Sequence, residues 1–146
     1  MMNNEIRLEE AVFDPTPPGQ ASSPRRILVA DDEAGMRVLL SEVLGDSGYH
    51  VDTAEDGAVA WAALQTKPYD LLITDHNMPN VTGEELIKKL RAARMGLPVV
   101  MVSGDFPQHE PAQNPPLQLA AKIMKPFVLA ELVDTVTSLL RLPAAC

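Results

Sequence analysis

The sequence predicts an α/β fold in which helices cover both faces of one parallel β-sheet. From Arg26 onward, short apolar runs alternate with longer segments of helical period, the pattern of a repeating strand and helix unit. The run Leu71–Thr74 suits a strand buried on both faces, and it stops at Asp75 before a loop rich in Pro, Asn and Gly. Asp75 suits the start of a turn, but strand ends are also where open α/β sheets place their chemistry.

The composition predicts one domain with its own core. The chain has 146 residues and is 46% hydrophobic, enough for one domain but not for two ordinary ones. A net charge of -8 argues against nucleic acid or an anionic membrane as a partner. The single cysteine, Cys146, excludes an intrachain disulfide and a cysteine metal site. No run has the length of a signal peptide core or a membrane span, so we expect a cytoplasmic protein.

The domain boundaries follow from composition. Residues 14–24 are rich in Pro and Ser, as in a linker, and predict a flexible N-terminal extension over residues 1–25. Residues 26–142 contain all the alternating runs and form the predicted domain, and residues 143–146 form a short tail.

The first apolar run, Ile27–Ala30, predicts a buried strand that ends in three consecutive acids, Asp31, Asp32 and Glu33. Packed carboxylates repel one another, and such a cluster is tolerated where a hard cation such as Mg²⁺ shares it. Acids also favour the start of a helix, and both interpretations can hold together. The helix is predicted by apolar residues at helical spacing: Met36, Leu39, Leu40, Val43 and Leu44.

The next elements continue the alternation. Residues 49–54 mix apolar and polar side chains and predict a half-exposed strand near an edge of the sheet. A helix follows from Asp56–Gly57 to the breaker Lys67–Pro68, with Trp61 in the core rather than at a ligand.

After the Asp75 loop, Gly83 begins a helix that turns Leu86, Ile87 and Leu90 inward. Its basic residues are most simply a solvated face. They are Lys88, Lys89, Arg91 and Arg94.

Two further strands each deliver a polar side chain. The strand 98–102 leads to Ser103, and the strand Ala121–Met124 leads to Lys125. Between them, four prolines predict a loop or a short, broken helix, since proline costs about 3 kcal/mol inside a helix. These are Pro107, Pro111, Pro115 and Pro116. The last helix has an apolar face formed by Leu129, Leu132, Val133, Val136, Leu139 and Leu140.

Four strand ends therefore present a chemically coherent set. Ser103 alone suits a turn residue, and Lys125 alone suits a surface cation. Together with Asp31, Asp32 and Asp75 they supply acids for a metal, a lone carboxylate, a hydroxyl donor and an ammonium group.

In this ordered set the chain resembles the receiver (CheY-like) domain of the two-component response-regulator family. The matching residues are Asp31–Asp32, Asp75 through Pro79 with Gly83 behind it, Ser103–Gly104 and Lys125 through Phe127. The resemblance covers Arg26 to about Leu142. It implies a flavodoxin-like, doubly wound sheet of five parallel strands in the order 2-1-3-4-5.

The resemblance also implies roles for the strand-end residues. Asp75 would accept a phosphoryl group from the phosphohistidine of a histidine kinase or a phosphotransfer protein. Asp32, Asp75 and the backbone carbonyl of Asn77 would hold Mg²⁺, with Asp31 acting through water. Lys125 would pair with Asp75 at rest and with a phosphoryl oxygen afterwards, and Ser103 would donate to another oxygen.

The same resemblance implies a cis peptide between Lys125 and Pro126. It further implies a signalling protein rather than an enzyme.

One rival function and two departures from the family pattern bear on the function, and the first departure is the set of four prolines between Ser103 and Lys125. A haloacid-dehalogenase-like phosphohydrolase needs a second Asp two positions after the nucleophile, where this chain has Asn77. Lys122 occupies the position of the family's aromatic switch. We therefore expect a stand-alone receiver that serves as a phosphorelay shuttle or sink, or binds a separate output protein, through the loop 104–117.

Overall fold

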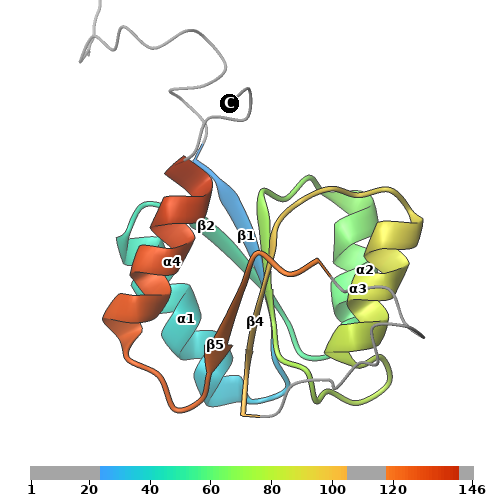
Figure 1. Ribbon diagram of the computed structural model, residues 1–146, viewed down its shortest axis with the longest axis horizontal. Coiled ribbons are helices and arrows are strands. Elements are labelled where there is room, and N and C mark those ends of the chain that lie inside the picture. The colour runs from blue at the N-terminus through green and yellow to red at the C-terminus, as the bar shows by residue number, and fades with distance from the viewer. Residues whose placement is uncertain (1–23, 105–117, 142–146) are drawn as a thin grey trace, which may run out of the picture.

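The computed structural model describes residues 24–104 and 118–141, in which five parallel strands form one sheet in the order β2-β1-β3-β4-β5 (Figure 1). The strands are β1 (Arg26–Ala30), β2 (His50–Ala54), β3 (Leu71–Thr74), β4 (Val99–Ser103) and β5 (Ala121–Met124). The helices are α1 (Ala34–Asp46), α2 (Gly57–Thr66), α3 (Gly83–Ala92) and α4 (Leu129–Arg141). This confirms the predicted flavodoxin-like sheet and its strand order.

Two hydrophobic layers hold the helices against the sheet. α1 and α4 cover one face, and α2 and α3 cover the other (Figure 1). Successive residues of a strand point to opposite faces, so Leu28 packs with α2 and α3 while Ile27 and Val29 pack with α1 and α4. The apolar run of β1 is therefore explained by burial on both sides.

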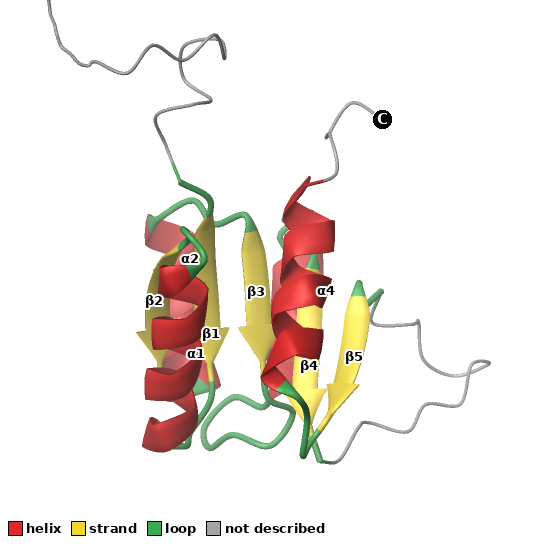
Figure 2. Ribbon diagram, turned by 90° about the vertical axis from the view of Figure 1, so that its left-hand side faces the viewer, coloured by secondary structure: helices red, strands yellow, loops and turns green. Residues whose placement is uncertain are grey.

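The central strands are more buried than the edges. β1, β3 and β4 are almost completely buried, whereas the edge strands β2 and β5 each have a single buried residue and are otherwise intermediate or exposed. The edge position predicted for residues 49–54 is therefore confirmed. All five strands run parallel, so their carboxyl ends lie together at one end of the sheet, across the strands rather than along an edge strand (Figure 2).

α3 starts at a capping box. Thr82 Oγ1 accepts the backbone N–H of Glu85 at 3.1 Å, and Glu85 Oε1 accepts the backbone N–H of Thr82 at 2.9 Å. Two donors that the first helical turn leaves unpaired are thereby satisfied. Leu86, Ile87 and Leu90 are buried as predicted.

Arg91 corrects the prediction of a purely solvated basic face on α3. Its guanidinium is half-buried and donates to the backbone carbonyls of Met95, Leu97 and Gln118 at 3.0 to 3.1 Å. Burial lowers the pKa of Arg91. The side chain therefore ties the end of α3 to the segment that leads into β5, whereas Lys88 remains an exposed surface cation paired with Glu84.

Other details differ from the sequence-based expectations. Leu39, expected on the buried face of α1, is 39% exposed. Ser103 is the last residue of β4 rather than the residue after it. The broken fourth helix predicted between β4 and β5 lies in residues 105–117, outside the described residues, as do residues 1–23 and the tail. Within the described ranges, no helix is long and apolar enough to cross a membrane.

Candidate functional site

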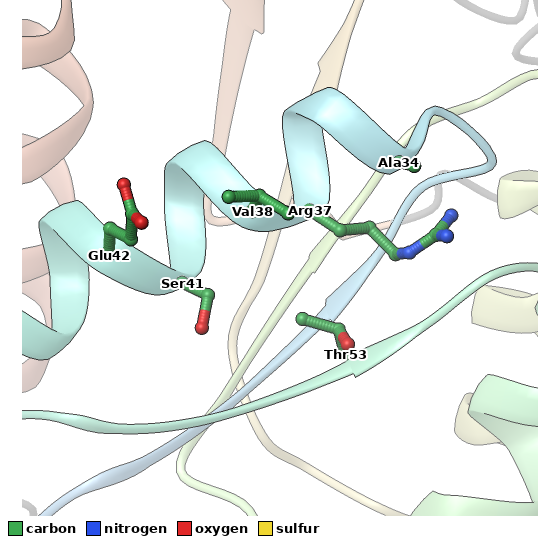
Figure 3. Close-up of a pocket in the computed structure, with 6 residues that line it drawn as sticks. All are labelled: Ala34, Arg37, Val38, Ser41, Glu42 and Thr53. Atoms are coloured by element: carbon green, nitrogen blue, oxygen red, sulfur yellow. The ribbon is translucent and has the colours of Figure 1, made fainter.

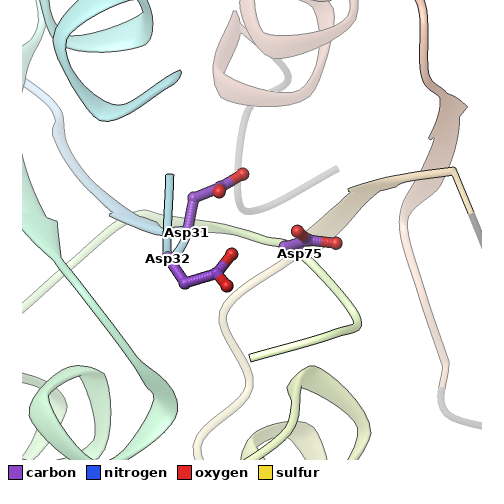
Figure 4. A group of neighbouring side chains, drawn as sticks. All are labelled: Asp31, Asp32 and Asp75. Atoms are coloured by element: carbon purple, nitrogen blue, oxygen red, sulfur yellow. The ribbon is translucent and has the colours of Figure 1, made fainter. Parts of the chain in front are cut away.

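Two neighbouring strands end side by side and bring three carboxylates together. β1 and β3 are paired in register as far as Ala30 and Thr74, so the residues after them leave the same end of the sheet. Asp31 and Asp32 follow β1, and Asp75 follows β3. One carboxylate oxygen of each lies within 4.8 Å of the other two (Figure 4).

Lys125 approaches these acids from the end of β5. Its Nζ lies 3.1 Å from Asp31 Oδ2, 3.4 Å from Asp75 Oδ2 and 3.6 Å from Glu33 Oε1. The structure thus brings Lys125 and Asp75 together as predicted, but the nearest partner of the ammonium is Asp31. Glu33 is a further partner that the sequence analysis assigned only to the acidic cluster.

Burial and neighbouring charges shift the pKa of both Asp31 and Lys125. Burial raises the pKa of Asp31, an effect that the Glu33 backbone N–H and the Lys125 ammonium reduce but do not cancel. Burial alone would lower the pKa of Lys125, but the hydrogen bond to Asp31 and the charges of Asp31 and Asp75 raise it overall. The ammonium is therefore held in its charged form at neutral pH.

Asp75 is buried and oriented by its own loop. Only 8% of the residue is exposed. Its Oδ1 accepts the backbone N–H of His76 at 2.7 Å and, at 3.4 Å, that of Asn77. Its Oδ2 faces Lys125. The carboxylate is thus fixed with one oxygen toward backbone donors and the other toward a cation.

Ser103 and Lys125 lie on adjacent strand ends. The backbone N–H of Lys125 donates to the Ser103 carbonyl at 3.0 Å, and Ser103 is 1% exposed. The peptide between Lys125 and Pro126 is cis, as predicted. Because they lie on adjacent strand ends, Ser103 and Lys125 are at the same end of the sheet as Asp75.

The loop after Asp75 packs tightly against the strand end. A Cβ on Gly83 would lie 2.1 Å from the Asp75 carbonyl oxygen, so only glycine fits there. The Gly83 backbone N–H donates to the His76 carbonyl at 2.8 Å, and Met78 is buried in the core. Asn77, the predicted carbonyl ligand, is exposed between these anchors.

The donor set fits a magnesium ion. The three carboxylates offer only oxygen atoms, which are the ligands that Mg²⁺ prefers. Asp32 is exposed, whereas Asp31 and Asp75 are buried, so the group opens to solvent on one side. That arrangement suits an ion that keeps several of its waters.

Arg37 is a site residue that the sequence analysis missed. It extends from α1 and donates from Nη1 to the Asp31 carbonyl at 2.8 Å. It lines a surface pocket of about 350 Å³ between α1 and β2, together with Thr53, Ser41 and Glu42 (Figure 3). Helical periodicity could not reveal this contact, because it depends on where a long side chain ends.

A second pocket adjoins Lys125 on the other side of α1. Its volume is about 410 Å³. It is lined by Met36, Leu39, Lys125, Pro126, Phe127 and Leu129. The exposure of Leu39 is explained by its place in this pocket.

The chain matches a known family model and several characterised relatives. The model of the response regulator receiver domain matches residues 27–137. The receiver protein CpdR of Brucella abortus is 33% identical over 116 residues, which cover 80% of this chain and 97% of CpdR. The sensor protein EvgS of Escherichia coli O157:H7 is 40% identical over 103 residues, or 70% of this chain and 9% of EvgS. The regulator CusR of E. coli K12 is 31% identical over 82% of this chain and 53% of CusR.

Solved structures agree with the fold. The chemotaxis protein CheY4 of Vibrio cholerae superposes with a TM-score of 0.72 at 29% identity, covering 80% of this chain and 99% of that one. The response regulator TrrA of Thermotoga maritima, in complex with Mg²⁺-BeF, gives a TM-score of 0.67 at 31% identity, with coverage of 79% and 98%. This chain spans 9% of EvgS and about half of regulators such as CusR.

Proposed function

Because the chain belongs to the response regulator receiver domain family, we propose that it accepts a phosphoryl group on Asp75 from a histidine kinase or phosphotransfer protein. This family is one of signalling domains. Because the chain belongs to this family, we no longer consider a haloacid-dehalogenase-like phosphohydrolase. The observation that carries the proposal is the buried Asp75 carboxylate, fixed by backbone N–H groups and set beside Lys125 and two further acids.

The proposed transfer forms one bond to phosphorus and breaks another. A carboxylate oxygen of Asp75 forms a bond to phosphorus as the P–N bond of the phosphohistidine breaks, and the departing imidazole nitrogen keeps that electron pair. Asp75 becomes an acyl phosphate. A carboxylate is a weak nucleophile toward an anionic phosphoryl group, so the surrounding cations must offset the repulsion.

Residues of this chain can supply that compensation. Lys125 already lies 3.4 Å from Asp75 Oδ2 and would pair with a phosphoryl oxygen after transfer, while the Ser103 hydroxyl would donate to another. Asp32, Asp75 and the Asn77 carbonyl would hold Mg²⁺, with Asp31 acting through water. When bound, the ion would offset the negative charge of the carboxylate and phosphoryl oxygens.

Partner binding is the proposed output. Lys122, at the position of the aromatic switch, is exposed on the edge strand β5, so no ring rotates there. We expect phosphorylation to act through Ser103, which ends β4 directly before residues 104–117, the segment through which we expect output.

Removal of one acid tests the metal half of this proposal. We expect Asp32→Ala to weaken Mg²⁺ binding about 10-fold or more and to slow phosphorylation by acetyl phosphate, because an exposed ligand is lost. The fold should persist, because one of three mutually repelling carboxylates is removed. The measurement is a titration of backbone amide shifts with Mg²⁺, combined with intact mass spectrometry at each concentration.

Asp46→Ala is the matched control, since this exposed acid is the last residue of α1, at the end of the helix opposite the acidic cluster. It should leave the Mg²⁺ affinity unchanged. Equal affinities of wild type and Asp32→Ala would contradict the assignment, as would phosphorylation that proceeds equally well in the presence of a chelator.

A further inference from the structure

We propose that Asp56 and Asn80 are positioning residues for the metal site. Their hydrogen bond fastens the loop after β3 to the start of α2, and so holds the Asn77 carbonyl where Mg²⁺ needs it. This inference rests on the proposed function. Neither residue touches the carboxylate cluster, and each alone suits an ordinary helix cap or turn.

One carboxylate joins two segments. Asp56 Oδ1 accepts the backbone N–H of Val59 at 2.8 Å and caps α2. Its Oδ2 accepts the side-chain amide of Asn80 at 2.8 Å, across 24 positions of sequence. Asp56 is buried. The N–H of Val59 and the Asn80 amide lower the pKa of its carboxyl despite that burial, so it stays ionised at neutral pH.

The two backbones also touch at this point. A Cβ on Gly57 would lie 2.1 Å from the Val81 carbonyl oxygen, so the loop lies directly on the first residue of α2. Asn80 itself has a φ of 71°, a left-handed conformation that Asn and Gly tolerate best. Gly57 in α2 and Asn80 in the loop therefore both permit the close approach of the two backbones.

This contact fixes the loop three residues after Asn77, on the far side of the buried Met78. The Gly83 backbone N–H donates to the His76 carbonyl, and Gly83 packs closely against the Asp75 carbonyl oxygen. Met78 is buried in the core. Between Met78 and Gly83, two side chains attach the loop tip to the rest of the domain: Asn80 bonds to Asp56, and Val81 packs against the core that contains α2 and α3 residues. Groups that orient metal ligands affect affinity without binding the metal.

The test separates the hydrogen bond from the backbone conformation. Asn80→Gly keeps the left-handed backbone and removes only the amide, whereas Asn80→Ala removes both. The exchange of Asp56→Asn with Asn80→Asp restores the bond in the opposite direction, because the amide then comes from position 56. Ile87→Val is the control, since it loosens the core under α3 without replacing a residue of the loop and without removing the hydrogen bond.

The readout is the dissociation constant for Mg²⁺, followed by the amide shifts of His76 and Asn77, beside the free energy of unfolding. We expect Asn80→Gly to raise the dissociation constant about 10-fold, Asn80→Ala to raise it at least as far, and the exchange to recover most of the loss. Ile87→Val should lower stability and leave the affinity unchanged.

Two failures are distinguishable. If wild type binds Mg²⁺ and Asn80→Gly binds it equally well while being less stable, the hydrogen bond is only structural and the inference is wrong. If wild type itself shows no Mg²⁺ binding, the proposed function fails together with the inference.

Discussion

Asp75→Asn is expected to abolish phosphorylation by acetyl phosphate, the largest effect that any single substitution should have on this chain. The amide has no carboxylate oxygen to form the acyl phosphate. Its shape still suits the site, because the amide oxygen can accept the backbone N–H of His76 as the Asp75 Oδ1 does now. The fold should therefore survive while the phosphoryl acceptor is lost.

The measurement is intact mass spectrometry with and without hydroxylamine, which cleaves acyl phosphates. Asp70→Asn provides a matched control, because Asp70 lies just before the other end of β3 and binds the backbone N–H of Arg26. That variant should be phosphorylated like wild type. A hydroxylamine-sensitive mass increment on Asp75→Asn equal to that of wild type would contradict the assignment.

The second large effect is expected on stability. Gly83→Ala should lower the free energy of unfolding by about 3 kcal/mol or more, because the new Cβ would overlap the Asp75 carbonyl oxygen. That oxygen belongs to the backbone and cannot swing away as a flexible side chain would. A loss of this size is a large part of the 5–15 kcal/mol that typical domains possess.

Gly45→Ala is the opposite case within the same chain. A Cβ at Gly45 would meet nothing within 4 Å, and the residue lies in the last turn of α1. We expect stability to rise by about 0.5 kcal/mol, since alanine favours a helix over glycine. Urea unfolding of both variants measures the difference. A Gly83→Ala protein as stable as wild type would mean that the loop is not held against Asp75.

Much of this site could be predicted because it follows from chain order. Parallel strands deliver their carboxyl ends to one end of the sheet, so Asp31, Asp75, Ser103 and Lys125 had to gather there once the strands were recognised. Their chemical types then indicated a metal site, and the phosphoryl role came from the resemblance to receiver domains. The apolar runs sufficed for this because each ends at a polar or charged residue.

Contacts between side chains could not be predicted in the same way. The position of the Lys125 ammonium nearer Asp31 than Asp75 depends on side-chain torsions and on burial. Arg91 was assigned to the solvated face because periodicity reports the direction in which a side chain leaves a helix, not where its guanidinium ends.

The Asp56 and Asn80 bond was also hidden from the sequence. Each residue has a sufficient local explanation, as a helix cap and as a turn residue. Their pairing across 24 positions arises only when the sheet brings the two loops together.

The most direct test of the account is a two-dimensional NMR comparison of wild type with Mg²⁺ alone and with Mg²⁺ and beryllofluoride, an analogue of the acyl phosphate. If Asp75, Ser103 and Lys125 form one phosphoryl site, beryllofluoride should shift the amides of His76, Gly104 and Lys125, and Asp75→Asn should eliminate these shifts. Identical spectra with and without beryllofluoride in wild type, or the same shifts in Asp75→Asn, would contradict the account.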